Sequence, residues 1–178
     1  AKARGQLGGG TVVSTIMSNV GLTESLSENG IKHLKTGVGD RKVLEGMLEC
    51  KAVMGGEDSG HMIFLNHHTT GDGILSALKL IEVIAAEQKP LSELASVMTV
   101  YPQVLENVEV DASRPDFMVI EPIAQVIRKV EQELGDSGRV LIRYSGTQPL
   151  LRVMVEGPDE DLTRQYCEQI CQAVRAHI

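Results

Sequence analysis

Hydrophobic and polar positions follow two different rhythms along the chain, and the change falls near residues 99–103. Before that point, short apolar runs alternate with helical patterns. The expected elements are a strand at 11–17, a helix at 22–29, a strand at 31–35, a helix at 40–49, strands at 53–54 and 61–65 around a glycine-rich loop, and a helix at 72–87. This alternation predicts an α/β domain, with a mixed, mostly parallel sheet and flanking helices.

The helix expected at 72–87 has the clearest pattern in this first part. Four of its apolar residues share one stripe, namely Ile74, Leu78, Ile81 and Ala85. Asp72 stands before this helix and Asp40 before the preceding one. Both are expected as N-caps, because an aspartate there accepts from free amides of the first helical turn.

After residue 103 the order of the elements changes. The expected elements are a strand at 104–110, a helix that begins at Pro122, strands at 139–144 and 151–156, and a helix from about 161. Proline in the first helical position and Gly135 after the last turn are typical helix boundaries. The order β-α-β-β-α predicts a small α+β domain.

Composition excludes two classes of partner. The chain has 178 residues, a formal net charge of −7 and no run of Lys or Arg longer than two, which argues against a nucleic-acid surface. No apolar stretch approaches the roughly 18 residues of a membrane helix, and no signal peptide opens the chain. We therefore expect a globular protein with neither nucleic acid nor membrane as a partner.

The three cysteines, Cys50, Cys167 and Cys171, cannot form an even disulfide framework, which favours a reducing cytoplasm. Cys167 and Cys171 are four residues apart on an expected helix and share a face. Buried, inert thiols are favoured over a metal pair. Residues 1–10 resemble the end of a helix and a loop, and the chain lacks an initial Met, so we expect a part of a longer protein.

The strongest chemical signal is the segment Arg143-Tyr-Ser-Gly-Thr-Gln-Pro-Leu-Leu-Arg152. It places two guanidinium groups on paired strands around a turn with two hydroxyls and a glycine. Guanidinium groups match phosphate bidentately, and Gly146 lets backbone amides approach an anion. A phosphate site is one interpretation of this segment, but the spacing alone slightly favours a polar hairpin with surface arginines.

A second signal is Gly55-Gly-Glu-Asp-Ser-Gly-His61, between two apolar segments. Glu57 and Ser59 could hydrogen-bond neighbouring hydroxyls of a sugar, and His61 could move a proton near neutral pH. An acidic loop with a capping serine explains the same residues. The segments 38–41 and 69–73 are equally well explained as N-caps.

Other segments give weaker signals. Residues 8–11 resemble a phosphate loop only superficially, because no Lys follows the glycines. The acidic run at 159–161 suits the first turn of a helix, and His67 and His68 are expected to be exposed. We expect no metal site in this chain.

Together, the segments at 38–41, 55–61, 69–73 and 143–157 resemble the phosphohexomutase superfamily, and within it the phosphoglucosamine mutases. The resemblance covers nearly the whole chain. It implies that residues 1–100 form domain III without its first strand, and that residues 101–178 form the mobile domain IV.

The resemblance also implies roles for particular residues. Glu57 and Ser59 would contact sugar hydroxyls, and His61 would be an acid/base aid. The phosphate that is not being transferred would be held by Arg143, Ser145, Gly146 and Thr147, with Arg152 as a weaker candidate.

Mutases of this kind convert glucosamine 6-phosphate to glucosamine 1-phosphate through a bisphosphorylated sugar, with a phosphoserine and a Mg²⁺ ion. The chain contains neither a Ser-His-Asn-Pro sequence nor an Asp-x-Asp-x-Asp loop. We therefore expect the nucleophile and the Mg²⁺ ligands in missing N-terminal domains, and no turnover by this chain alone. Asn66 stands where Asp is expected, and Gly37 stands where many relatives carry Lys.

Two hypotheses follow for the function. The chain is either the phosphosugar-binding part of an isomerase, which could pair as a homodimer in its full-length form, or a non-catalytic phosphosugar-binding or regulatory module. The residues that precede Ala1 in the natural protein would distinguish them.

Overall fold

The computed structural model describes residues 5, 7–111 and 113–178. The chain divides into two compact units, Ala1–Val100 and Tyr101–Ile178. Part of the helix-end and loop expected at 1–10 falls on residues 1–4 and 6, outside the described residues. Residues Gly8–Gly10 form a short 3-10 turn.

The first unit contains a four-stranded sheet in the order β2-β1-β3-β4. The strands are β1 (Thr11–Thr15), β2 (Lys32–Thr36), β3 (Met54–Gly56) and β4 (Met62–Phe64). β1 is parallel to both β2 and β3, whereas β4 runs antiparallel to β3. The expected mixed, mostly parallel sheet is confirmed.

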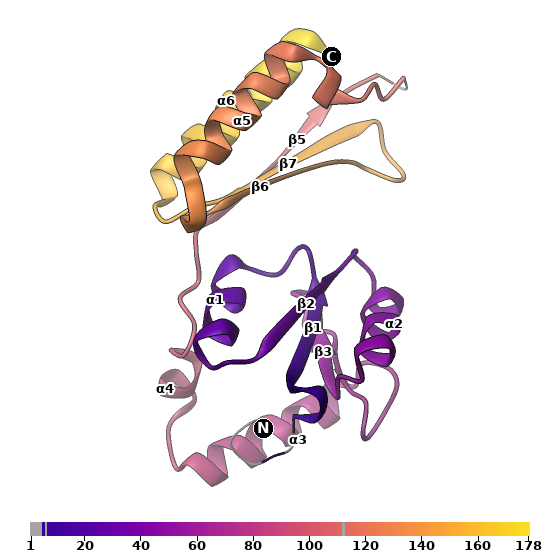
Figure 1. The fold of residues 1–178 in the computed structure, drawn as a ribbon, viewed down its shortest axis with the longest axis vertical. Coiled ribbons are helices and arrows are strands. Elements are labelled where there is room, and N and C mark those ends of the chain that lie inside the picture. The colour runs from indigo at the N-terminus through magenta and orange to yellow at the C-terminus, as the bar shows by residue number, and fades with distance from the viewer. Residues whose placement is uncertain (1–4, 6, 112) are drawn as a thin grey trace. The chain divides into compact units, whose positions relative to one another are not determined.

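Helices flank this sheet, as expected for an α/β domain. Those that flank it are α1 (Val20–Glu28) and α2 (Asp40–Cys50); the unit also contains α3 (Gly73–Glu87) and a short α4 (Leu91–Ala95) that the sequence did not indicate. α1 and α2 lie on opposite faces of the sheet (Figure 1). The apolar core of the unit joins Val13 on β1 to Val43 and Met47 on α2 and to Ile63 on β4.

Two details of the helices differ from expectation. Gly39 occupies the N-cap of α2, and Asp40 is the first helical residue, so the N-cap predicted at Asp40 is wrong. Asp40 still places a carboxylate in the first turn, where the helix dipole favours negative charge. Asp72 does cap α3, and its carboxylate accepts from the Leu75 amide at 2.9 Å.

The apolar stripe of α3 does not enter the core of the first unit. Ile74 is 77% exposed, and Leu78 and Ile81 are each 59% exposed. The 3.6-residue period correctly predicts the helix, but the period alone does not show whether its apolar stripe is buried.

The second unit is the expected small α+β domain. Its elements are β5 (Gln103–Glu109), the 3-10 turn η3 (Phe117–Val119), α5 (Glu121–Leu134), the 3-10 turn η4 (Gly135–Ser137), β6 (Arg139–Tyr144), β7 (Leu150–Glu156) and α6 (Glu160–His177). The strands form an antiparallel sheet in the order β5-β7-β6.

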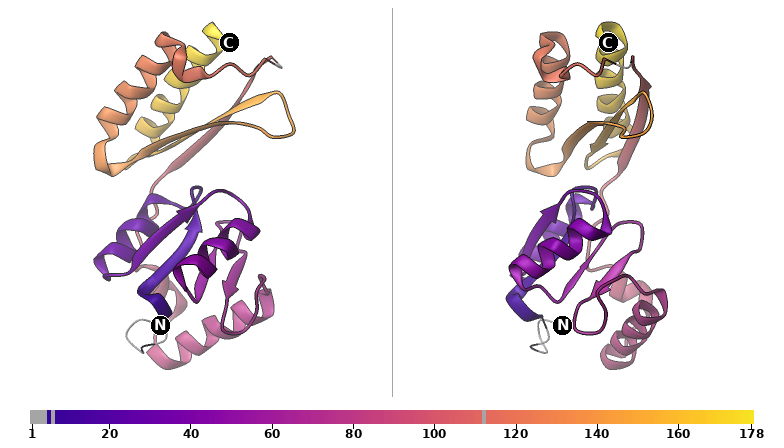
Figure 2. Two further views of the ribbon diagram at one scale, coloured as in Figure 1. Left: turned by 45° about the vertical axis from the view of Figure 1, so that its right-hand side comes forward. Right: turned by 90° about the vertical axis from the view of Figure 1, so that its right-hand side faces the viewer.

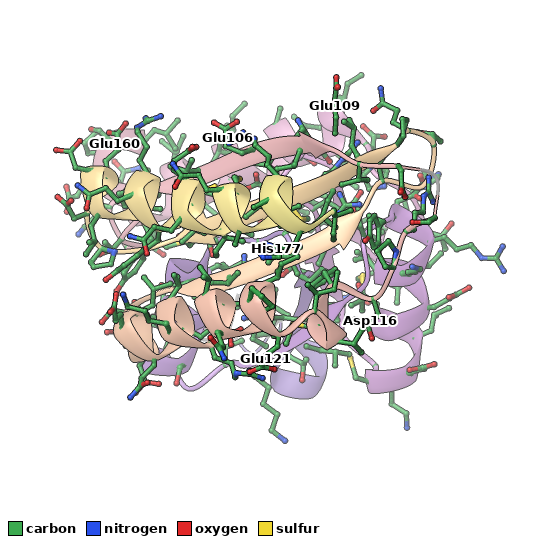
Figure 3. The ribbon with its side chains drawn as sticks, turned by 90° about the horizontal axis from the view of Figure 1, so that it is seen from above. Glu106, Glu109, Asp116, Glu121, Glu160 and His177 are labelled. Carbon is green, nitrogen blue, oxygen red and sulfur yellow. The ribbon has the colours of Figure 1, made fainter. Side chains whose placement is uncertain are left out.

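α5 and α6 lie side by side on one face of this sheet (Figures 1 and 2). α6 begins after Asp159, which caps it, and Glu160 lies at its start (Figure 3). Alternate residues of β7, such as Val153 and Val155, pack against the two helices and are fully buried. The opposite face of the sheet carries most of the charged residues of the strands, among them Arg143, Arg152 and Glu156, whereas Glu106 lies on the same side as Val153.

Cys167 and Cys171 lie on the buried face of α6. The Cys167 thiol contacts the Val153 carbonyl at 3.7 Å. Its hydrogen bond with Cys171, together with burial, raises the pKa of Cys167. A protonated thiol is a poor nucleophile and a poor metal ligand, which fits the expectation of an inert residue.

Candidate functional site

Three segments that are separate in the sequence meet in the first unit. The Glu57 carboxylate accepts a hydrogen bond from the Gly39 amide at 2.9 Å. The His61 Nε2 atom accepts one from the Gly71 amide at 3.0 Å and lies 3.9 Å from the Asp40 carboxylate. The segments 38–41, 55–61 and 69–73 are therefore joined in one place.

The sheet explains why two of these segments meet. β2 ends at Thr36 and β3 at Gly56, and both strands run parallel to β1. Loops that follow parallel strands leave the sheet at the same edge, where α/β proteins commonly bind ligands. The backbone of Gly39 has φ 123°, which only glycine adopts readily, so the turn into α2 depends on this residue.

Two polar groups at this junction have no partner in the part of the chain that the structure describes. They are the second carboxylate oxygen of Glu57 and the hydroxyl of Ser59. Ser59 is exposed and Glu57 is half-buried. Such groups can each bind a hydroxyl without breaking an existing contact.

The contact with Gly71 restricts the chemistry of His61. The hydrogen bond from the Gly71 amide occupies Nε2, which leaves Nδ1 as the ring nitrogen available to other groups. A Cβ on residue 71 would lie 2.5 Å from the His61 ring, so a larger residue at that position would force the ring to move. His61 therefore connects the second and third segments.

Lys42 is a residue of this region that no sequence motif indicated. Its amine lies 2.9 Å from where a Cβ of Gly37 would stand. The contact brings a positive charge beside Gly37, the position of one departure from the phosphohexomutase pattern. Asn66, the other departure, is exposed.

In the second unit, Arg143 on β6 stands directly opposite Arg152 on β7, and Asn107 on β5 is the next residue of the same row. The three side chains share the sheet face that α5 and α6 leave uncovered. Arg152 Nη2 lies 3.5 Å from the Ser145 hydroxyl, at the limit of a hydrogen bond. Arg143 has no hydrogen-bond or ion-pair partner among the described residues.

The turn between β6 and β7 leaves several amides unused. The Ser145 amide donates to the Leu150 carbonyl at 2.8 Å, which closes the turn. The amides of Gly146, Thr147 and Gln148 donate to no described residue. Consecutive free amides, close in sequence to two arginines that face each other, are donors that suit an anion.

This turn is also held by the segment that follows β5, which the sequence did not indicate. The Val110 amide donates to the Pro149 carbonyl at 3.0 Å. The Tyr144 hydroxyl donates to the Pro115 carbonyl at 2.6 Å, and burial raises the pKa of Tyr144.

The predicted site residues thus form two clusters, one in each unit. Glu57, Ser59 and His61 belong to the first unit. Arg143, Ser145, Gly146, Thr147 and Arg152 belong to the second.

A groove of about 550 Å³ in the first unit is a separate feature. It lies between α3 and the β3–β4 pair, and most of its lining surface is apolar, from side chains such as Met62, Phe64, Leu80 and Val83, although polar and charged residues such as Lys79 and Glu82 also line it. Glu57, Ser59 and His61 do not line it. An apolar lining of this kind does not suit a phosphorylated sugar.

The part of the chain that the structure describes contains neither a metal-binding cluster nor a membrane-spanning helix. No group of three or more His, Cys, Asp or Glu side chains there could hold a metal ion. No described helix is long and apolar enough to span a bilayer. His67 and His68 are exposed, as expected.

Two family models match the chain. The phosphoglucomutase/phosphomannomutase alpha/beta/alpha domain III matches residues 1–101, and the phosphoglucomutase/phosphomannomutase C-terminal domain matches residues 80–173.

Curated relatives are much longer than this chain. The phosphoglucosamine mutase of Desulforapulum autotrophicum is 64% identical over 175 residues, which are 98% of this chain and 38% of that protein. The phosphoglucosamine mutase of Syntrophobacter fumaroxidans is 51% identical over 99% of this chain and 39% of its own length. The chain therefore spans about two fifths of the length of these relatives.

A solved structure shares the fold. The N-acetylphosphoglucosamine mutase of Aspergillus fumigatus superposes with a TM-score of 0.77 at 19% identity, over 93% of this chain and 38% of that one.

Proposed function

The chain belongs to the phosphoglucomutase/phosphomannomutase family, and we propose that it forms the phosphosugar-binding part of a phosphoglucosamine mutase. Such an enzyme is an isomerase that interconverts glucosamine 6-phosphate and glucosamine 1-phosphate through a bisphosphorylated sugar. The choice of amino sugar is supported by the two relatives of that name at 64% and 51% identity.

The phosphate that is not being transferred would bind at the turn between β6 and β7. Arg143 and Arg152 supply charge, Ser145 and Thr147 supply hydroxyls, and Gly146 supplies an amide. One observation carries this assignment: Arg143, with no partner of its own, stands opposite a second guanidinium and next to three unused amides. Like charges directly opposite on a sheet are unfavourable, and a bound anion would offset that cost.

The sugar would bind at the junction of the three segments in the first unit. Glu57 would accept from sugar hydroxyls through its unused oxygen, while the Gly39 contact fixes the carboxylate. The Ser59 hydroxyl would form a hydrogen bond with a neighbouring hydroxyl of the sugar. Because these groups recognise hydroxyls rather than one phosphate, they could hold the sugar in either of its two orientations.

His61 is a weaker candidate for proton transfer. Nε2 is occupied by the Gly71 amide, so a proton exchanged with substrate would pass through Nδ1. The phosphoserine and the Mg²⁺ ligands would lie in domains of the whole protein outside this chain, where the ion would neutralise charge that develops on the transferred phosphoryl group. A cytoplasmic location agrees with three free cysteines.

The test is a titration of the ¹⁵N-labelled 178-residue chain with inorganic phosphate. We expect the amide signals of residues 146–148 to shift with millimolar affinity and Arg143→Ala to abolish the shift. The matched control is Arg164→Ala, which removes an exposed arginine from α6. A wild-type spectrum without shifts in the turn would refute the phosphate site.

A second assay, on the complete natural protein, distinguishes the proposed mutase from the non-catalytic binding module. Conversion of glucosamine 6-phosphate to glucosamine 1-phosphate supports the mutase. Phosphate binding at residues 146–148 without any conversion would support a binding or regulatory module instead.

A further inference from the structure

Arg114 reaches the phosphate turn from a distant part of the sequence. Its Nη2 atom donates to the Gln148 carbonyl at 3.2 Å, across a separation of 34 residues. The same carbonyl also accepts from the Leu150 amide at 2.9 Å. The carbonyl at the end of the turn is therefore held by two donors, one of which is charged.

This contact matters for a turn that binds an anion. A carbonyl oxygen repels a phosphate oxygen, and a carbonyl that is engaged by another donor opposes the binding of an anion less. Arg114 and Leu150 engage that of Gln148, and Val110 engages that of Pro149. The free donors of the turn, the amides of residues 146–148, are those that an anion requires.

The backbone of Arg114 provides a second, independent observation. Its φ is 46°, in the left-handed region that residues other than glycine seldom adopt. Backbone strain of this kind persists only where the surrounding structure holds it, and it is concentrated at functional sites. The side chain also forms no ion pair with a described carboxylate, although Asp111 and Asp116 are close in sequence.

We propose that Arg114 is a positioning residue for the phosphate turn, acting through the Gln148 carbonyl. It keeps the carbonyl end of the turn fixed so that the amides of residues 146–148 stay available to phosphate. The proposal rests on the proposed phosphate site, and it adds a residue from outside the segment between Arg143 and Arg152.

The experiment compares four forms of the ¹⁵N-labelled 178-residue chain: wild type, Arg114→Ala, Arg114→Lys and the control Arg164→Ala. Each is titrated with inorganic phosphate while the amide shifts of residues 146–148 are followed. Loss of one hydrogen bond predicts that Arg114→Ala raises the dissociation constant about three- to tenfold. Arg114→Lys keeps a charged donor, so the increase in the logarithm of its dissociation constant should be at most half of that in Arg114→Ala.

Hydrogen exchange without phosphate separates positioning from direct contact with the anion. Val110 and Leu150 donate to carbonyls of the turn, so their amides should exchange faster in Arg114→Ala than in wild type or the control. Weakened phosphate binding with unchanged exchange at both amides would overturn the positioning role, because the arginine would then act on the anion itself. Unchanged affinity in Arg114→Ala would overturn it as well.

Failure of this inference can be told from failure of the proposed site. If wild type shows no phosphate shift at residues 146–148, the site itself is wrong. Suppose that phosphate shifts the amide signals of residues 146–148 in wild type but not in Arg143→Ala, and that Arg114→Ala binds phosphate with the affinity of wild type. Only the role of Arg114 is then wrong.

Discussion

Arg143 and Arg152 face each other across β6 and β7 in the same row of the sheet, and no described carboxylate neutralises Arg143. Opposed guanidinium groups repel each other, so the pair destabilises the folded state when nothing is bound between the two side chains. An anion that binds between the two guanidinium groups and the free amides of the turn would offset this repulsion.

The first prediction concerns Arg143 in the full-length protein, which we propose to be a mutase. Arg143→Ala should lower kcat/KM for glucosamine 6-phosphate about 10- to 100-fold, because a charge-assisted bidentate contact contributes about 1.5–3 kcal/mol. Steady-state kinetics measure this effect. Without a phosphate contact, the variant would have the same kcat/KM as Arg164→Ala.

Much of the architecture follows from local sequence, because it depends on short-range patterns. The strand predicted at 139–144 matches Arg139–Tyr144, since a short apolar run of Val140, Leu141 and Ile142 there precedes a turn with Gly and Pro. The cap at Asp72 was also predicted. At α2, a glycine with φ 123° takes the cap position instead of Asp40, because the backbone conformation of the turn decides which residue is the cap.

The candidate site was predictable only in its parts. Gly39 and Glu57 are 18 residues apart, and Arg114 and Gln148 are 34 apart, so their hydrogen bonds depend on the order of strands in each sheet. Motifs identified Glu57, Ser59 and Arg143 as candidates. No local pattern indicates that Gly71 meets His61, or that Lys42 lies beside Gly37.

The second prediction concerns Glu57, which has both a structural contact and a proposed contact with sugar. Glu57→Ala should speed exchange of the Gly39 amide, because its acceptor is lost. Glu57→Gln keeps a carbonyl oxygen and should protect that amide better than Glu57→Ala while still weakening substrate binding in the whole enzyme. Hydrogen exchange and KM measure the two effects, and equal exchange in wild type and Glu57→Ala would contradict the structural contact.

The third prediction is a pH dependence at the start of α5. Hydrogen bonds from Gln125, and then from Arg128, lower the pKa of Glu121. A carboxyl with a lowered folded-state pKa stabilises the folded state above its unfolded pKa of about 4.3, and that contribution is lost as the pH falls through the lower folded value. Glu121→Gln should therefore reduce the acid dependence of the unfolding midpoint below about pH 4.3. An acid profile identical to wild type would disprove the coupling.

The fourth prediction concerns the N-cap of α6. The Asp159 carboxylate accepts from the Leu162 amide at 2.9 Å. Asp159→Ala should lower the free energy of unfolding of the second unit by about 1 kcal/mol, and Asp159→Ser should lower it less, because serine is also a good cap. Urea unfolding followed on signals of that unit measures both. Equal stability of Asp159→Ala and wild type would show that water replaces the cap at no cost.

The last prediction tests the junction of Gly71 with His61. A Cβ at residue 71 would lie 2.5 Å from the imidazole, whereas a Cβ at Gly73 would meet nothing within 4 Å. Gly71→Ala should therefore destabilise the first unit by about 1–3 kcal/mol, and Gly73→Ala should have a much smaller effect. If the imidazole is the obstacle, Gly71→Ala should cost less in a His61→Ala background, and the coupling energy from urea unfolding of the four proteins measures the difference. Additive effects would mean that Gly71 and His61 do not touch in solution. The segment 69–73 would then have no contact with the loop at 55–61 through this pair.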